Sequence, residues 1–156
     1  MNSEKILVVE DEWVVADQIC RNLKDFGYTY STASTAEEAV RKAQEERPDL
    51  ILMDIVLKGE MDGIEAADRI TSQFDIPVLF LTAYTNHEYI ERAKQTKPFG
   101  YLVKPFNEKE LYTNIDTCHR QGNGTSRLLG EGAWVGSIRL IGHSGIPFLS
   151  SRSLMK

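Results

Sequence analysis

The chain has 156 residues, and its 18 lysines and arginines against 23 aspartates and glutamates give a formal net charge of −5. With 42% hydrophobic and 26% charged residues, it has the composition of a globular protein with a substantial core, which excludes collagen, a coiled coil and a disordered chain. No apolar run reaches the roughly 18 residues that a membrane helix needs, and charged residues 10–12 follow too closely on Met1 for a secretory signal. We therefore expect a cytoplasmic protein without membrane contact.

Apolar runs of strand length alternate with helical patterns through the first 120 residues. The expected strands are 5–9, 28–33, 50–53, 78–81 and 100–103. The expected helices, with apolar residues at a period near 3.6, are 15–26, 34–43, 62–70, 87–96 and 107–119. Ser34 with Glu37 predicts a capping box for the second helix, and Asp62 predicts a cap for the third. Continuous apolar strands between amphipathic helices indicate a doubly wound α/β fold, with a parallel sheet buried on both faces.

The last 36 residues differ in composition from the rest. They hold seven of the 11 glycines and carry four basic residues against one acidic residue. We predict a boundary at 120–124, which separates a domain over 1–120 from a Gly/Ser-rich tail over 121–156 without an independent core. The negative net charge and the lack of an Arg/Lys cluster argue against nucleic-acid binding.

The two cysteines, Cys20 and Cys118, are far apart and show no metal-ligand spacing. We expect both to be reduced thiols of the core. The histidines are scattered, and His87 and His119 are expected on helix surfaces.

Polar residues follow four of the predicted strands, at the edge where ligands of parallel sheets bind. They are Glu10, Asp11 and Glu12 after the first strand, Asp54 after the third, Thr82 and Ala83 after the fourth, and Lys104 and Pro105 after the fifth. Gathered carboxylates repel one another unless a cation lies among them, and hard oxygen ligands suit Mg²⁺. A lysine and a hydroxyl beside them suit phosphoryl oxygens. Each residue alone could be a helix cap or a surface charge, but their joint placement predicts a site for a metal and a phosphate.

Five sequence segments together resemble the receiver (CheY-like) domain of two-component response regulators. They are Ile6–Glu12 (ILVVEDE), Leu52–Ile55 (LMDI), Met61–Gly63 (MDG), Leu81–Ala83 (LTA) and Tyr101–Phe106 (YLVKPF). The resemblance covers residues 4–120 and implies the flavodoxin-like strand order 2-1-3-4-5.

The resemblance also implies a role for each site residue. Asp54 would accept a phosphoryl group from a sensor histidine kinase, in a reaction that the domain itself catalyses. Thr82 and Lys104 would bind the phosphoryl oxygens. The remaining implied roles are Mg²⁺ binding by Glu10, Asp11, Asp54 and the Val56 carbonyl, access for the phosphodonor past the small Ala83, a cis peptide before Pro105, and an inward-turning switch aromatic at Tyr101.

Three features depart from the family pattern. Glu10 replaces the commoner aspartate, with a longer arm that reaches a metal directly or through water. The usual Met-Pro after the phosphorylated strand is missing, and 57–60 adds one residue before Met61. Bulky Tyr84, two positions after Thr82, predicts slow dephosphorylation.

The expected function is that of a single-domain response regulator that signals through protein contacts, to a target or a phosphotransfer protein. Residues 134–142 leave open a second reading, the receiver portion of a hybrid kinase, and the departures leave open a scaffold that is never phosphorylated. Val56, in place of a second acid, argues against a phosphatase, and the acidic pocket argues against a flavodoxin-like cofactor binder. Alternating charges on the last two helices fit a phosphorylation-dependent homodimer or a plain solvated face.

Overall fold

The computed structural model describes residues 4–83 and 87–122 of the chain, and these form alternating strands and helices. The strands are β1 (Lys5–Val9), β2 (Thr29–Ala33), β3 (Leu50–Asp54), β4 (Val78–Thr82) and β5 (Gly100–Val103). The helices are α1 (Trp13–Phe26), α2 (Ala36–Glu46), α3 (Gly63–Phe74), α4 (His87–Lys94) and α5 (Glu108–Gly122). All strand pairs are parallel, in the order β2-β1-β3-β4-β5, which confirms the predicted flavodoxin-like topology.

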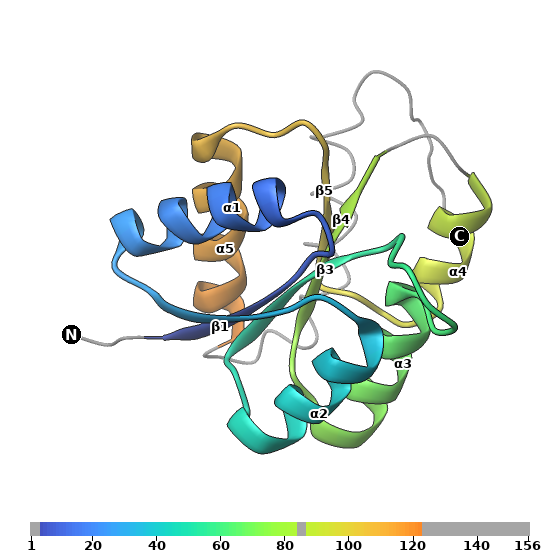
Figure 1. Ribbon diagram of the computed structural model, residues 1–156. Coiled ribbons are helices and arrows are strands. Elements are labelled where there is room, and N and C mark those ends of the chain that lie inside the picture. Colours follow the sequence, from blue (N-terminus) through green and yellow to red (C-terminus); the bar gives the residue numbers. More distant parts are fainter. Residues whose placement is uncertain (1–3, 84–86, 123–156) are drawn as a thin grey trace, which may run out of the picture.

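Strands β1, β3, β4 and most of β5 are buried on both faces, as their continuous apolar sequences predict, whereas the edge strand β2 is mostly exposed. Figure 1 shows α1 and α5 on one face and α2 and α3 on the other. Along β1, Leu7 and Val9 pack into the core on the α2–α3 side, whereas Ile6 and Val8 pack with α1 and α5. This alternation follows from the two-residue period of a strand, and it fixes the register of β1 relative to both helical layers.

The ends of two helices show where sequence patterns are ambiguous. The α2 cap is Thr35, whose hydroxyl accepts from the Glu38 amide, while the Glu38 carboxylate accepts from the Ser34 amide. The predicted pair of Ser34 and Glu37 is therefore wrong by one residue, because two acceptable cap residues and two glutamates stand side by side. The Asp62 cap of α3 is confirmed, since Asp62 accepts from the Glu65 amide.

The cysteine prediction is confirmed, and one histidine prediction is wrong. Cys20 and Cys118 are buried and free, and burial raises the pKa of their thiols to about 11 and about 12. His119 is not a surface residue: its Nδ1 lies 3.2 Å from Glu4 Oε1, and its ring lies 5.3 Å from that of Tyr28. The α5 helix turns His119 toward β1 because the same helical face carries the core residue Ile115, one turn earlier.

The predicted boundary at 120–124 overlaps the end of α5 at Gly122, and the tail from 123 onward lies outside the described residues. Among the helices that the structure describes, none is long and apolar enough to cross a membrane.

Candidate functional site

The polar residues that follow the strands meet at one edge of the sheet. Glu10 comes directly after β1, Asp54 and Thr82 end β3 and β4, and Lys104 comes directly after β5. Glu10, Asp54 and Thr82 are only 3–6% exposed. The strands hold these groups at buried positions because the parallel topology brings all four carboxyl ends together. The prediction of convergence is confirmed for Glu10, Asp54 and Lys104 by the contacts of Lys104 with both carboxylates, and Thr82 ends the strand that pairs with β3.

Three carboxylates form a compact cluster at this edge. Glu10, Asp11 and Asp54 each present an oxygen within 4.8 Å of the others. Burial, followed by the negative charge of Glu10, raises the pKa of Asp54 from 3.8 to about 7. Carboxylates gathered this closely repel one another, and a divalent cation with hard oxygen preference fits this donor set.

Lys104 supplies the positive charge in the cluster. Its Nζ lies 2.9 Å from Glu10 Oε1 and 3.4 Å from Asp54 Oδ2. Burial alone would lower the lysine pKa, but the hydrogen bond from Lys104 to Glu10 and the charges of Asp54 and Glu10 raise it. Lys104 is thus an ammonium fixed beside two carboxylates, placed to meet a further anion.

Backbone amides orient the carboxylates. The Val56 amide donates to Asp54 Oδ1 at 3.2 Å, and the Lys58 amide donates to Asp11 Oδ2 at 3.1 Å. The Glu12 amide donates to Glu10 Oε2 at 3.2 Å. Two of these three donors lie in the loop after Asp54, so this loop holds two of the acids despite the missing Met-Pro and the extra residue.

Gly63 allows this loop to close against β3. Its amide donates to the Ile55 carbonyl at 3.0 Å, and a Cβ at this position would overlap the Asp54 carbonyl oxygen. Glycine is required here by the close approach of two backbone segments. The Met61–Gly63 motif therefore has a packing reason that lies directly under the acidic cluster.

A hollow of about 320 Å³ opens above the cluster. Its lining residues are Glu10, Asp11, Glu12, Asp54, Val56, Leu57, Lys58, Ala83 and Lys104. Ala83 is exposed at its rim, and the Val56 side chain is 52% exposed. Small and flanking groups at the rim leave Asp54 reachable from solvent although its side chain is mostly buried.

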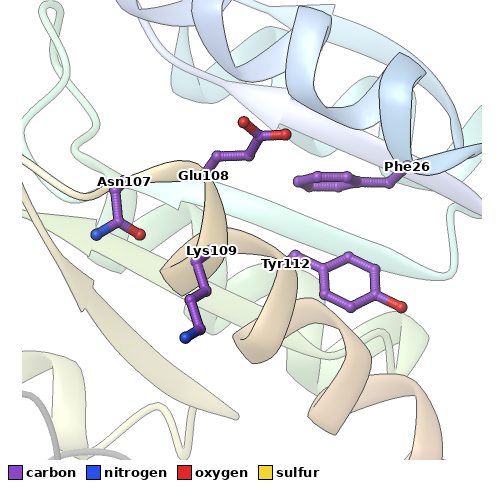
Figure 2. Close-up of a pocket in the computed structure, with 5 residues that line it drawn as sticks. All are labelled: Phe26, Asn107, Glu108, Lys109 and Tyr112. Atoms are coloured by element: carbon purple, nitrogen blue, oxygen red, sulfur yellow. The ribbon is translucent and has the colours of Figure 1, made fainter.

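A second, larger hollow of about 470 Å³ lies between α1 and α5, away from the carboxylates. Figure 2 shows the Phe26 and Tyr112 rings on one side of it, and their centroids are 5.0 Å apart. The other lining residues are Asn107, Glu108 and Lys109. The charged groups of this larger hollow are exposed residues, whereas the smaller hollow holds the buried acidic cluster and is the candidate site.

The structure also shows contacts of Thr82 and Tyr101, two further residues with predicted roles. The Lys104 amide donates to the Thr82 carbonyl at 2.8 Å, which ties the exit of β5 to β4. The Tyr101 side chain is 3% exposed, with its hydroxyl donating to the Ile90 carbonyl of α4 at 3.4 Å. The peptide between Lys104 and Pro105 is cis, as the resemblance implies. Tyr84 lies outside the described residues.

Sequence reasoning missed two contacts. It assigned Lys104 to phosphate and did not pair it with Glu10, although acidic and basic residues at the ends of two strands were a usable signal. It assigned Asp62 only a capping role, but Arg92 of α4 also binds Asp62, with Nη1 2.9 Å from Oδ2 and Nη2 3.4 Å from Oδ1. Nothing in the sequence marks an ion pair across 30 residues.

Comparison with known proteins shows the family of this chain. Residues 6–116 match the family described as the response regulator receiver domain. The transcriptional regulatory protein PdtaR of Mycobacterium tuberculosis is 33% identical over 128 residues, which are 81% of this chain and 62% of PdtaR. PhoP of Bacillus subtilis, an alkaline phosphatase synthesis regulator, is 35% identical over 76% of this chain and 50% of PhoP. The chain thus spans about half to three-fifths of the length of these curated relatives.

Solved structures show the same fold. The N-terminal domain of a response regulator/sensory box/GGDEF three-domain protein from Carboxydothermus hydrogenoformans is 39% identical, with a TM-score of 0.72 over 77% of this chain and 97% of that one. The chemotaxis protein CheY4 of Vibrio cholerae is 32% identical, with a TM-score of 0.69 over 75% and 99%. On the family match, the relatives and the shared strand order, this chain belongs to the response regulator receiver domain family.

Proposed function

We propose that the chain accepts a phosphoryl group on Asp54 from a phosphohistidine of a sensor histidine kinase and passes the signal on through protein contacts. One observation carries this proposal. A buried carboxylate at the end of the central strand lies 3.4 Å from a lysine ammonium and within 4.8 Å of two further carboxylates. This arrangement combines a nucleophile, a cation site and a positive charge at one solvent-reachable point.

Mg²⁺ fits the donor set among Glu10, Asp11 and Asp54, and the Val56 carbonyl is the expected fourth protein ligand. The compact grouping of these carboxylates supports the assignment, since an oxygen of each lies within 4.8 Å of the others. When bound, Mg²⁺ would lower the repulsion between the carboxylate and an incoming phosphoryl group.

The transfer itself needs mainly positioning and charge stabilisation from the protein. A carboxylate oxygen of Asp54 forms a bond to phosphorus as the bond from phosphorus to the donor imidazole nitrogen breaks. The imidazole keeps that electron pair and takes up a proton. Lys104 offsets charge on the phosphoryl oxygens, and the Thr82 hydroxyl donates a hydrogen bond to one of them. Ala83 leaves room for the donor.

Phosphorylation would reach partner proteins through β5 and α4. Thr82 precedes the segment that leads to α4, and Tyr101 already links β5 to α4 through the Ile90 carbonyl. A shift of Thr82 toward a phosphoryl group would alter the packing around Tyr101 and thereby the surface of α4. A downstream target or a phosphotransfer protein would bind this surface in one state only, without direct contact to nucleic acid.

Intact-mass spectrometry with acetyl phosphate as donor tests the proposal. We expect one added phosphoryl group in the presence of Mg²⁺, none in EDTA, and none in Asp54→Asn. Asp68→Asn, an exposed aspartate on α3, is the matched control and should accept phosphate like the wild type. Phosphate on Asp54→Asn, or none on the wild type with both acetyl phosphate and a kinase, would contradict the proposal and favour the scaffold reading.

A second candidate is the receiver portion of a longer signalling protein. The curated relatives are longer than this chain, and the similar structure from Carboxydothermus hydrogenoformans is the first domain of a three-domain protein. An immunoblot of the source cells with an antibody against residues 4–122 distinguishes the two. A band well above 17.7 kDa would support the longer protein.

A further inference from the structure

The contact between Lys104 and Glu10 spans most of the sheet. In the order β1-β3-β4-β5, the strands that precede these two residues lie three spacings apart, roughly 14 Å. Nevertheless, Lys104 Nζ is closer to Glu10, at 2.9 Å, than to Asp54 of the intervening β3, at 3.4 Å. The ammonium therefore makes its shorter contact with the residue that follows the more distant strand.

Both oxygens of Glu10 take part in this arrangement. Oε1 accepts from Lys104, and Oε2 accepts from the Glu12 amide at 3.2 Å. The side chain of Glu10 is 1% exposed, whereas Asp11 is partly exposed. The backbone thus orients the Glu10 carboxylate through one oxygen, and the other oxygen binds the lysine. Among the acids of the cluster, it contacts Lys104 at the shortest distance.

We propose that Glu10 is a positioning residue that fixes the Lys104 ammonium where phosphoryl oxygens arrive on Asp54, in addition to facing the cation. The inference rests on the proposed function and deepens it. A lysine side chain is flexible, so an ammonium held in place before transfer avoids an ordering cost during transfer. Glutamate suits this role because its additional methylene carries the carboxylate farther across the sheet edge than aspartate would.

A positioning role and a pure metal-ligand role predict opposite orders of damage for two variants of Glu10, because one variant changes the length of the side chain and the other changes its charge. Glu10→Asp keeps the charge but shortens the arm, so the 2.9 Å contact would open beyond hydrogen-bond distance. Glu10→Gln keeps the arm and an accepting oxygen but loses the charge. If Glu10 positions Lys104, Glu10→Asp is the more damaging change. If Glu10 acts only as a charged metal ligand, Glu10→Gln is the more damaging one.

The rate of phosphorylation by acetyl phosphate at saturating Mg²⁺ tests this order. We expect Glu10→Asp to be roughly 10-fold slower than the wild type and Glu10→Gln to be about 3-fold slower. Glu60→Asp, an exposed glutamate in the loop after Asp54, is the matched control and should stay within about twofold. The double variant Glu10→Asp/Lys104→Met should be no slower than Lys104→Met, because both changes act on one ammonium. The reverse order, or losses that multiply, would overturn the proposal.

Two measurements do not depend on phosphorylation. In the metal-free protein, the NMR signal of the Lys104 side chain, assigned from its absence in Lys104→Arg, should shift in Glu10→Asp and not in Glu60→Asp. By calorimetry, the Kd for Mg²⁺ should change by no more than about 3-fold in Glu10→Asp, since a carboxylate remains beside the cation. An unmoved Lys104 signal would overturn the positioning role. If the Lys104 signal shifts in Glu10→Asp but the wild type takes no phosphate, the proposed function would be overturned instead. The contact between Glu10 and Lys104 would then be a purely structural ion pair.

Discussion

Leu50–Met53 and Asp54 belong to the same central strand and are all buried, but burial has opposite consequences for them. Removal of the four apolar side chains from water stabilises the folded protein. Asp54 is 6% exposed, and its burial beside Glu10 raises its pKa to about 7, so its ionised form is disfavoured in the folded protein. One strand therefore stabilises the fold over its apolar length and places a carboxyl group at its end whose ionised form is unfavourable.

The apolar part of the strand should be the more costly to disturb. Leu52 is fully buried in the core between the sheet and helices α1 and α5. Leu52→Ala should lower the free energy of unfolding by about 2–5 kcal/mol, because it removes buried methyl groups and leaves a cavity. Urea titration measures the change. Val56→Ala, at a 52% exposed position two residues beyond Asp54, should cost less than about 0.5 kcal/mol. Equal losses of unfolding free energy in the two variants would contradict the greater importance of the buried apolar strand.

Gly63 joins the two regions, and the next largest effect is expected there. Gly63→Ala should lower the free energy of unfolding by about 3 kcal/mol, because its methyl group would overlap the Asp54 carbonyl oxygen and force the backbone apart. It should also slow phosphorylation, since the amides of Val56 and Lys58 orient the acids from the same loop. Ser72→Ala, exposed on the same helix, is the control. A Gly63→Ala protein of wild-type stability would show that the close approach is not required.

Removing the charge of Asp54 should have the opposite sign. The carboxyl ionises near 3.8 in the unfolded chain and near 7 in the folded one. The folded metal-free protein therefore holds a proton that the unfolded chain lacks, and Asp54 lowers stability increasingly as pH rises from about 4 to about 7. Asp54→Asn should be more stable than the wild type by roughly 1–2 kcal/mol at pH 8 in EDTA, and about equally stable near pH 4.

Urea titrations at several pH values measure this difference. If Mg²⁺ binds the cluster as proposed, it should close the gap at pH 8, because a ligand of the folded wild type stabilises it by mass action. Asp68→Asn, on the exposed face of α3, should track the wild type at every pH. A stability difference that stays constant with pH would show that the change acts through packing and not through charge.

The buried apolar strands could be predicted from the sequence, whereas the side-chain contacts of the site could not, for one physical reason. Continuous apolar runs of strand length such as Val78–Leu81, set between helical patterns, favour strands buried on both faces. The strands, to within one residue at each end, and the edge that gathers Asp54 and Lys104 therefore follow from the sequence. Contacts between side chains depend on rotamers and on distances across several strands, which the sequence does not encode locally. The link from Lys104 to Glu10 and the inward turn of His119 are of this kind.

The smallest expected effect concerns the pair that joins the loop after Asp54 to α4. Arg92 binds both carboxylate oxygens of Asp62, but the two side chains are 49% and 26% exposed, so solvent screens the attraction. A double-mutant cycle with Arg92→Met and Asp62→Asn, which keeps the cap, should give a coupling of about 0.5 kcal/mol at low salt and less at high salt. The pair of Arg69 and Glu65, one helical turn apart on α3, should couple no more strongly. A coupling energy above about 2 kcal/mol would show that this pair interacts as strongly as a buried ion pair and is not screened like a surface pair.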